Sequence, residues 1–249
     1  MKLSTRTLLG LFIFSLGATA HSEQFSALVF SDAYDRYHHR NVPAVRETFE
    51  FLAKKNFFKL TWVERDLEFA KETYANYDVI VFVSANPCEL NDRKRKEFME
   101  YVTNGGGVMG VHAASATAKE AKRWLWWEEL MGRVFVSHPP KKAGIMSVQD
   151  PEFPATMHLP PKWLWTDEWY TFHTPVPESL NVVLTVEEES YRPEEKHRMG
   201  DPHPIAWHHN PKGGRVFYTA IGHIAESYYD EAFRQHLFGG MLWATGWGK

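Results

Sequence analysis

Four histidines lie in sequence contexts that favour a catalytic or metal-binding role. His112 lies in residues 110–114 (GVHAA), where an apolar segment turns sharply among small residues, and His223 follows another apolar segment. His39 precedes an expected helix, and His138 precedes two prolines, which favours an extended and displayed backbone. An imidazole titrates near neutral pH, so it can serve as an acid, a base or a metal ligand. These residues therefore predict either acid–base or metal chemistry.

A metal site is the first form that this chemistry could take. Imidazole and carboxylate ligands together suit zinc or another divalent ion. We predict that the ligands come from His39, His112, His138 and His223, together with Glu168. The close spacing of an H-E-x-x-H motif is absent, so the alternative that each histidine holds a backbone carbonyl stays open.

Two carboxylates beside two aromatic residues form a second candidate group, in residues 167–170 (DEWY). We predict that Asp167 and Glu168 act with His112 as catalytic residues, although a solvated turn is the alternative. Aromatic rings offer flat apolar faces that suit the C–H faces of a sugar, and the chain has 10 Trp, 10 Tyr and 17 Phe. The predicted substrate-binding residues are Asp32, His39, Trp169 and Tyr170.

Alternating apolar and amphipathic segments predict the elements that position these residues. We expect strands at 25–30, 59–63, 78–84, 108–111 and 215–220, and helices starting near 41 and covering 91–101, 116–130 and 231–244. Strands that are apolar on both faces and separated by helices indicate a parallel sheet covered on both sides, with flavodoxin-like winding. Residues 133–215 are less regular, with strands at 180–186 and 205–208, and we expect an insertion on the same domain.

The strand ends explain how residues far apart in the chain could meet. In an open parallel sheet, ligands bind at the carboxyl ends of the strands. Ser31-Asp32, Ser84, His112 and His223 each follow an expected strand of this sheet. We therefore predict one pocket along that edge.

The first twenty residues predict export. Lys2 and Arg6 precede an apolar run from Leu8 to Leu16, and residues 18–20 (ATA) match a signal peptidase site. We expect a secretory signal at 1–20 and one domain at 21–249, delivered to the periplasm or the cell exterior; a buried first strand is the alternative. No other apolar stretch approaches membrane length, so we expect no membrane contact after the signal is removed.

Charge, glycine and cysteine patterns exclude other classes of function. Net charge is −3 and no basic block is present, which argues against nucleic acid as a partner. Gly105-Gly106-Gly107 precedes a strand instead of following one, so we expect no nucleotide cofactor. The single cysteine, Cys88, allows no internal disulfide, and the turn at 110–114 carries histidine instead of a nucleophilic thiol.

The order of these motifs resembles one known family. The sequence is similar to ThuA-like (trehalose utilisation) proteins in motifs that span almost the whole of the chain after residue 20: 37–39 with 42–43, 76–82, 105–114, 126–132, 138–139, 167–170, 203–207, 214–219, 222–223, 239–240 and 243–244. The resemblance implies a flavodoxin-like fold of the class I glutamine amidotransferase type, with helices on both faces of a parallel sheet. Asn41 stands where the family commonly has Ser, and Phe153 where an Asp-His-Pro element often occurs.

The resemblance also implies sugar metabolism, around 3-keto-glycosides made by a partner oxidoreductase. We expect an enzyme, a hydrolase, lyase or isomerase, that acts on a disaccharide or 3-keto-glycoside through the histidine-rich site. Some relatives look like metal binders, which agrees with a divalent ion such as zinc. The alternative is a non-catalytic sugar-binding module of the same fold.

Overall fold

One nine-stranded sheet runs through the computed structural model, which describes residues 23–31, 40–116, 123–173 and 175–247. Its strands are β1 (Ser26–Phe30), β2 (Lys59–Val63), β3 (Val79–Val83), β4 (Gly107–Val111), β6 (Lys142–Val148), β7 (Lys162–Asp167), β9 (Asn181–Val186), β10 (Pro204–His209) and β11 (Arg215–Thr219). In space they follow the order β2-β1-β3-β4-β11-β10-β9-β6-β7.

The first five strands in this order form a parallel half. Every residue of β3 and β4 is buried, because helices cover both faces of these strands. The order β2-β1-β3-β4-β11 is the flavodoxin-like winding that the sequence predicts, and the five expected strands lie within one residue of their predicted bounds. The carboxyl ends of these strands therefore share one edge.

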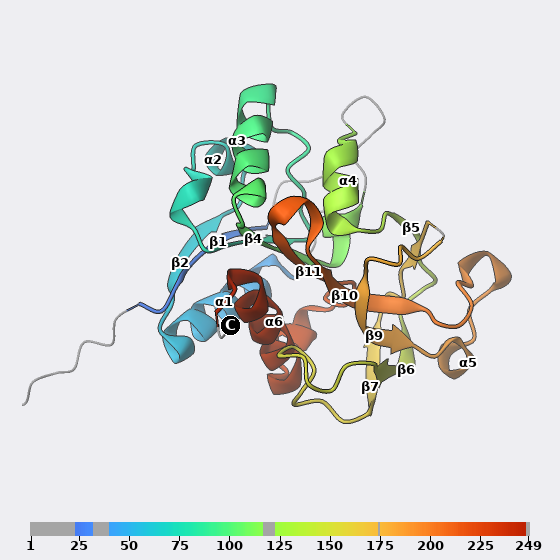
Figure 1. Ribbon diagram of the computed structural model, residues 1–249. Helices are drawn as coiled ribbons and strands as arrows, with labels where there is room; N and C mark the ends of the chain where they lie inside the picture. Colours follow the sequence, from blue (N-terminus) through green and yellow to red (C-terminus); the bar gives the residue numbers. More distant parts are fainter. Residues whose placement is uncertain (1–22, 32–39, 117–122, 174, 248–249) are drawn as a thin grey trace, which may run out of the picture.

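Five helices form the outer layers. Helices α1 (Val42–Asn56) and α6 (Glu231–Thr245) cover one face, and α2 (Asp66–Phe69), α3 (Asp92–Thr103) and α4 (Leu125–Met131) cover the other (Figure 1). The Asn91 side chain caps α3 by accepting a hydrogen bond from the Lys94 N–H at 3.0 Å. The helix expected at 116–130 is wrong at its start, because Ala116 is extended and the described helix begins at Leu125.

The segment that the sequence marks as irregular builds an antiparallel half. Strands β10, β9, β6 and β7 continue the same sheet, each antiparallel to its neighbour. The β6–β7 hairpin is absent from the prediction, because both strands mix buried and exposed positions and so lack the continuous apolar run of β3 or β4. A small second sheet pairs β5 (Phe135–Ser137) with β8 (Thr171–Phe172), and α5 (Glu188–Tyr191) packs near β6.

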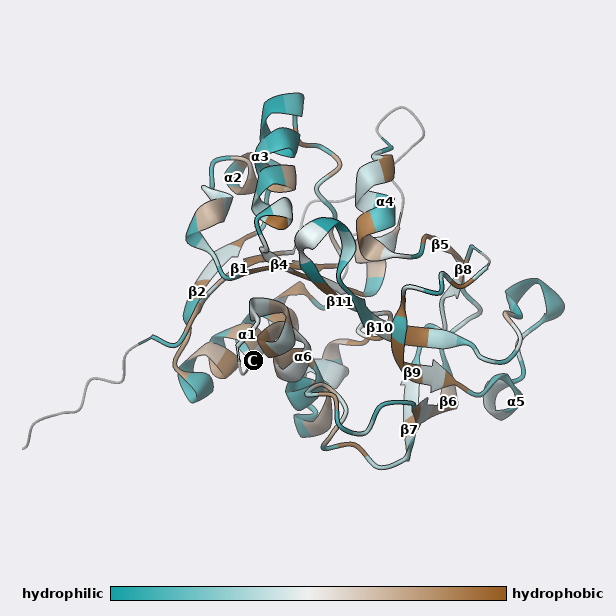
Figure 2. Cartoon of the chain, viewed as in Figure 1, coloured by the Kyte–Doolittle hydropathy of each residue, from teal (hydrophilic) through white to brown (hydrophobic). Residues whose placement is uncertain are grey.

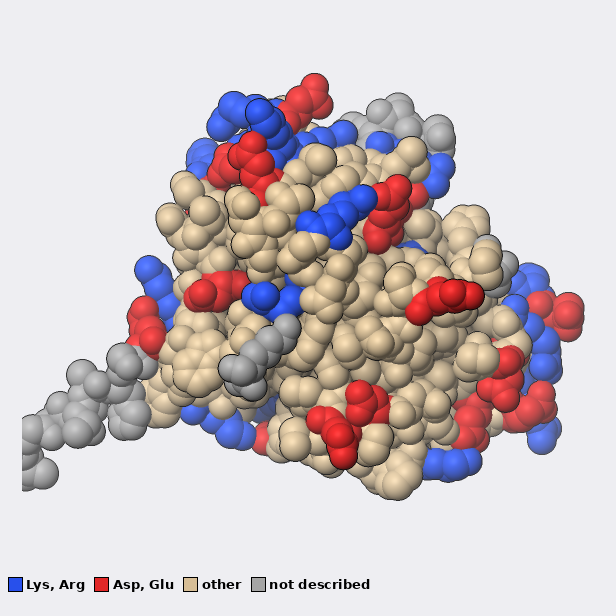
Figure 3. Space-filling view, viewed as in Figure 1, with Lys and Arg blue, Asp and Glu red and all other residues tan. Residues whose placement is uncertain are grey.

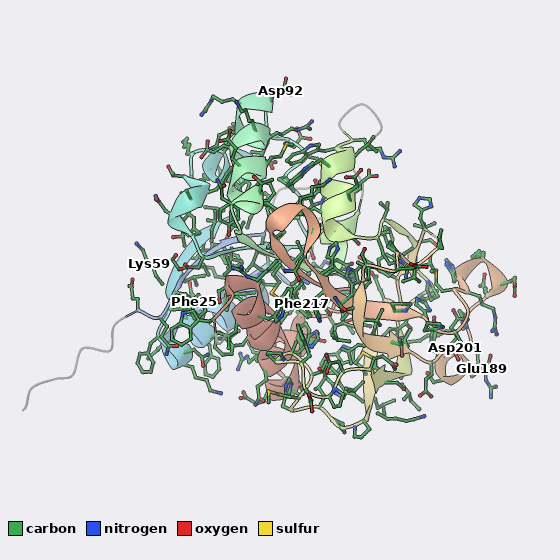
Figure 4. All side chains as sticks on the ribbon, viewed as in Figure 1. Phe25, Lys59, Asp92, Glu189, Asp201 and Phe217 are labelled. Atoms are coloured by element: carbon green, nitrogen blue, oxygen red, sulfur yellow. The ribbon has the colours of Figure 1, made fainter. Side chains whose placement is uncertain are left out.

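The core lies between the sheet and its helices. Figure 2 shows apolar colours concentrated on the strands and polar colours on the outer part of α3. Phe217 of β11 points toward α6, where a Cβ on Gly240 would lie 2.2 Å from its ring, so a glycine is needed there (Figure 4). Charges of both signs are interspersed on the face in view (Figure 3). No helix in the described part of the chain is long and apolar enough to cross a membrane.

Candidate functional site

His112 is the centre of the candidate site. It follows β4 directly with a left-handed backbone, φ 54°, and its side chain is fully buried. Its Nδ1 lies 2.9 Å from the carbonyl oxygen of Ala220, which can only accept, so neutral His112 carries its proton on Nδ1. The lone pair of Nε2 consequently faces the site. The Tyr218 hydroxyl supports the turn by donating to the His112 carbonyl oxygen at 2.7 Å.

His223 meets His112 from the end of β11. Gly222 takes a φ of 130°, and a Cβ there would lie 2.9 Å from the Tyr228 hydroxyl oxygen, so this turn requires glycine. The turn carries the His223 ring to His112, with Nδ1 of His223 3.3 Å from Nε2 of His112. The two strand ends therefore converge as the sequence predicts.

Asp167 holds that turn in place. Its buried carboxylate accepts hydrogen bonds from the backbone N–H groups of Gly222 at 2.8 Å, His223 at 3.2 Å and Glu168 at 2.8 Å. The Trp165 indole N–H is a fourth donor, at 3.3 Å. Burial raises the pKa of the Asp167 carboxyl to about 6, although these hydrogen bonds favour the charged form. Both oxygens are engaged by N–H donors, so the geometry makes Asp167 a positioning residue.

Glu168 is the carboxylate that faces the histidines. Its Oε2 lies 3.2 Å from His223 Nδ1, 3.6 Å from His112 Nε2 and 3.5 Å from His138 Nε2. Burial raises the pKa of Glu168, and the nearby His138 lowers it. One carboxylate oxygen can thus stabilise positive charge on any of the three imidazoles.

Tyr170 completes the group. Its hydroxyl donates to His112 Nε2 at 2.7 Å, and burial raises the pKa of this hydroxyl well above its usual value, so it stays protonated. A second buried pair, His203 and Glu188, holds the backbone of Tyr170. His203 Nε2 donates to the Tyr170 carbonyl oxygen at 2.9 Å, and His203 Nδ1 lies 3.1 Å from the Glu188 carboxylate.

The distances in this group fit a small tetrahedral metal ion. His112 Nε2, His223 Nδ1 and Glu168 Oε2 are separated by 3.3, 3.6 and 3.2 Å. Ligands at about 2.0–2.2 Å from a tetrahedral zinc ion are about 3.3–3.6 Å apart. The Nδ1–H bond of His112 to a carbonyl is also the kind of outer contact that fixes a metal-binding tautomer. These three residues could therefore hold zinc.

The other predicted residues are placed differently. His138, 35% exposed, lies beside Glu168 on the outer side of the group. Trp169 is fully buried and donates its indole N–H to the Lys142 carbonyl oxygen at 3.0 Å, so its ring has no open face for a sugar. Asp32 and His39, which the sequence assigns to the substrate and the metal, lie outside the described residues.

Some supporting residues could not be recognised from the sequence. The two prolines around His203 predict a loop, yet His203 anchors Tyr170. Ser115 donates to the Tyr218 hydroxyl at 2.8 Å, beneath His112. The only sequence signal for Ser115 is its place in the turn after β4. Neither residue has a local motif that announces its partner.

Comparisons with known proteins agree with this fold. A ThuA-like protein from Bacteroides uniformis is 25% identical, over 92% of this chain and 95% of that chain, with a TM-score of 0.77. A GMP synthase-like protein from Thermoplasma acidophilum, 12% identical, covers 90% and 96% with a TM-score of 0.51, which confirms the amidotransferase-like fold. A β-galactosidase from Bacillus circulans, 14% identical, matches 92% of this chain but 32% of its own, with a TM-score of 0.57.

The family comparison is more specific than the structural ones. A search of curated proteins finds no match. The family model described as ThuA, trehalose utilisation, matches residues 26–244, which include every described residue of the site. The chain therefore belongs to the ThuA family.

Proposed function

We propose that this protein is an exported enzyme that acts on a disaccharide or an oxidised glycoside, as a hydrolase, lyase or isomerase. The observation that carries the proposal is the convergence of His112 Nε2, His223 Nδ1 and Glu168 Oε2 beside the Tyr170 hydroxyl. Membership in a family described by trehalose utilisation supports a sugar as the substrate. A 3-keto-glycoside supplied by a partner oxidoreductase fits this chemistry best.

His112 is suited to remove a proton from such a substrate. A keto group at C3 acidifies the proton at C2, and a base near neutral pKa can accept that proton. The fixed tautomer of His112 presents an unprotonated Nε2, and Glu168 Oε2, at 3.6 Å, stabilises the imidazolium that forms. A positioned general base typically contributes about 10²–10⁴ in rate.

Tyr170 is suited to the other half of the reaction. Loss of the C2 proton leaves negative charge on the keto oxygen. A hydroxyl that stays protonated and lies 2.7 Å from His112 Nε2 can donate to that oxygen once the substrate displaces the Tyr170–His112 bond. Proton removal and charge stabilisation would then occur at adjacent side chains.

With a divalent ion at this site, a different residue would have to act as the base. Bound by His112, His223 and Glu168, zinc would supply Lewis-acid polarisation of the keto oxygen. The His112 lone pair would then be coordinated to the ion, and His138, whose Nε2 lies 3.5 Å from Glu168 Oε2, would be the remaining base. Its partial exposure leaves room for a substrate proton to reach it.

The test is turnover of a 3-keto-glycoside by protein lacking residues 1–20, together with its zinc content by elemental analysis. We expect product formation by the wild type and its loss in H112A. If zinc is present at one ion per chain and chelation abolishes turnover, H138A should also lose activity. If zinc is absent, H138A should stay active. A fully active H112A variant, or a wild type that never forms product, contradicts the proposal.

A non-catalytic sugar-binding module is the second candidate. The observation that favours it is the fold match to about a third of a β-galactosidase chain, 32%, which indicates that this architecture occurs as one part of a larger enzyme. Calorimetry would support it if trehalose or a 3-keto-glycoside binds and no product forms over long incubation.

A further inference from the structure

Three buried polar atoms without a hydrogen-bond partner lie at the carboxyl edge of the parallel half. They are Ser31 Oγ, Asn41 Oδ1 and Ser84 Oγ, on residues that are 1%, 2% and 5% exposed. Among the described residues, only Arg95, Arg133 and His208 also carry such an atom. Buried polar groups in proteins are nearly always paired, so three unpaired ones at the edge that carries the site need an explanation.

Ser84 is placed next to His112 by the register of the sheet. Val83 pairs with Val111, and the Ser84 N–H continues the ladder by donating to the Val111 carbonyl oxygen at 3.0 Å. Ser84 and His112 then take the same left-handed turn, with φ of 52° and 54°. Such angles are uncommon outside glycine and cluster at binding and active sites. Because Ser84 and His112 share this φ at neighbouring positions of the sheet, we expect their Cα–Cβ bonds to point in the same direction.

Asn41 is tied to the other side of the site. Its Nδ2 donates to the carbonyl oxygens of Gly222 at 2.8 Å and His223 at 3.2 Å, in the turn that positions the His223 ring. Both acceptors are carbonyls, so the orientation of the Asn41 amide is fixed and its Oδ1 has no hydrogen-bond partner. That oxygen can only accept a hydrogen bond.

Ser31 follows β1, the neighbour of β3. Phe30 pairs with Phe82, which puts Ser31 beside Val83 and one position before Ser84 along the strands. The Ser31 N–H donates to the Val63 carbonyl oxygen at 3.1 Å, so its backbone is held and its hydroxyl alone is unpaired. The three unpaired atoms thus lie on residues directly after β1, directly after β3 and directly before α1, all at the edge that carries His112.

The chemistry of these atoms selects the ligand. Asn41 Oδ1 needs a donor, and the two hydroxyls can each donate or accept. None of the three side chains carries a charge. A fully ionised carboxylate or phosphate offers no donor to Asn41, whereas a hydroxyl group can donate to Asn41 Oδ1 and can pair with either serine hydroxyl.

We propose that Ser31, Asn41 and Ser84 form a subsite that binds neighbouring hydroxyl groups of a pyranose ring, next to the carbon that reacts at His112. The identity of the ring rests on the proposed function, because that function makes a sugar the substrate. The subsite leaves these polar atoms unpaired in the free protein and pairs them in the complex. Ser84 is the member that lies closest to His112 along the sheet.

The S84A variant tests this directly. Alanine keeps the Cβ and removes only the unpaired hydroxyl, so the ligand-free protein should unfold at the same temperature as the wild type or higher. S147A is the matched control, because the Ser147 hydroxyl is bonded to Glu187 at 2.6 Å and Ser147 pairs with Lys162 at the opposite end of β7 from Asp167. Binding of α,α-trehalose and D-glucose is measured by calorimetry and by the shift in unfolding temperature.

The expected result is a sugar-dependent rise in unfolding temperature for the wild type and S147A, with affinity about three- to tenfold weaker in S84A. The S31A/S84A double variant should weaken binding further. The proposal is overturned if neither sugar stabilises the wild type, if S84A binds as tightly as the wild type, or if S84A unfolds at a clearly lower temperature, since its hydroxyl would then have a structural role.

Turnover of a 3-keto-glycoside separates this proposal from the proposed function. Sugar binding that S84A weakens, with no turnover by the wild type, removes the enzyme and keeps the subsite. Turnover by the wild type with an unchanged KM in S84A removes the subsite and keeps the enzyme. Failure of the subsite proposal and failure of the proposed function therefore give different results when the wild type and S84A are compared.

Discussion

The parallel and antiparallel halves of the sheet contribute different things to one site. The parallel half delivers His112 and His223 at its strand ends, where ligands bind in folds of this type. The antiparallel half delivers Glu168 and Tyr170 just after β7, although β7 lies four positions from β11 in the sheet. The Asp167 carboxylate joins the halves by accepting hydrogen bonds from the Gly222–His223 turn.

The parallel half is thus a general platform for a site, and the inserted antiparallel half adds the groups specific to this protein. Parallel strand ends of one winding can hold many chemistries, because the fold fixes only where they meet. The carboxylate and the phenol that face the imidazoles come from the inserted segment. The reaction type should therefore depend mainly on residues 167–170, and the location of the site mainly on the parallel half.

Replacing His112 tests the platform and should have the largest effect. We expect H112A to lower turnover of a 3-keto-glycoside by about 10²–10⁴, or about 3–5 kcal/mol in activation free energy, because it removes both the proposed base and the acceptor of the Tyr170 hydroxyl. The measurement is kcat under saturating substrate.

The control for H112A is the buried histidine His236, on the parallel half but outside the site. Its Nδ1 donates to the Ala155 carbonyl oxygen at 2.8 Å, and its Nε2 lies 3.0 Å from Thr219 Oγ1. H236Q should lower the unfolding temperature and leave kcat of the folded protein near that of the wild type. Equal losses of kcat in both variants would mean that H112A acts through general destabilisation.

Asp167 and Glu168 are neighbours in sequence, but replacing Asp167 should mainly lower stability, whereas replacing Glu168 should mainly lower activity. D167N places an amide nitrogen against the Gly222 N–H or the His223 N–H, so two donors face each other inside the protein. We expect a loss of about 2–4 kcal/mol in the free energy of unfolding, measured by denaturant titration.

Glu168 is the matched test on the other side of the pair. E168Q should change the free energy of unfolding by less than about 1 kcal/mol, because glutamine keeps the shape of the side chain and burial already disfavours the charge that the substitution removes. Zinc content and turnover should fall instead. If E168Q destabilises the protein as strongly as D167N does, the division between a positioning and a functional carboxylate is wrong.

The two halves also differ in how far the sequence predicts them. Strands such as β3 and β4 are apolar throughout, so burial on both faces identifies them without knowledge of their partners. The β6–β7 hairpin mixes buried and exposed positions along both strands, and its partner β9 comes later in the chain. Its existence depends on tertiary pairing that no local pattern encodes.

The same limit applies to the site. The convergence of His112 and His223 follows from parallel strand ends, and His138 and Glu168 join them in the structure. The sequence could not distinguish Asp167 from Glu168, since adjacent side chains at a strand end point to opposite sides. It also could not show that Trp169 turns inward against Gly144, with a Cβ there lying 2.9 Å from the indole ring.

The pH dependence of stability sharpens the assignment of Asp167. Its pKa is raised from 3.8 to about 6, so the folded protein binds the proton more tightly than the unfolded chain does. The corresponding stability is fully present below about pH 4 and is lost as pH rises through 6, by up to about 3 kcal/mol. The difference in unfolding free energy between the wild type and D167N should therefore shrink from pH 4 to pH 7.

Taking that difference removes the contribution of other groups that titrate in the same range. Burial lowers the pKa of His208 and of His236 to about 4, and both residues are present in the two proteins. A difference that grows with pH would show that the four N–H donors outweigh burial and that the folded pKa of Asp167 lies below its unfolded value.

Tyr170 should give the smallest effect, because Y170F removes one hydrogen-bond donor and keeps the ring. We expect kcat to fall by about tenfold, since a neutral donor contributes about 1–1.5 kcal/mol, with little change in KM. Zinc content should stay at the wild-type level, as the three ligand atoms remain. Loss of zinc in Y170F would make the phenol part of the metal site, and an unchanged kcat would confine the chemistry to the imidazoles and Glu168.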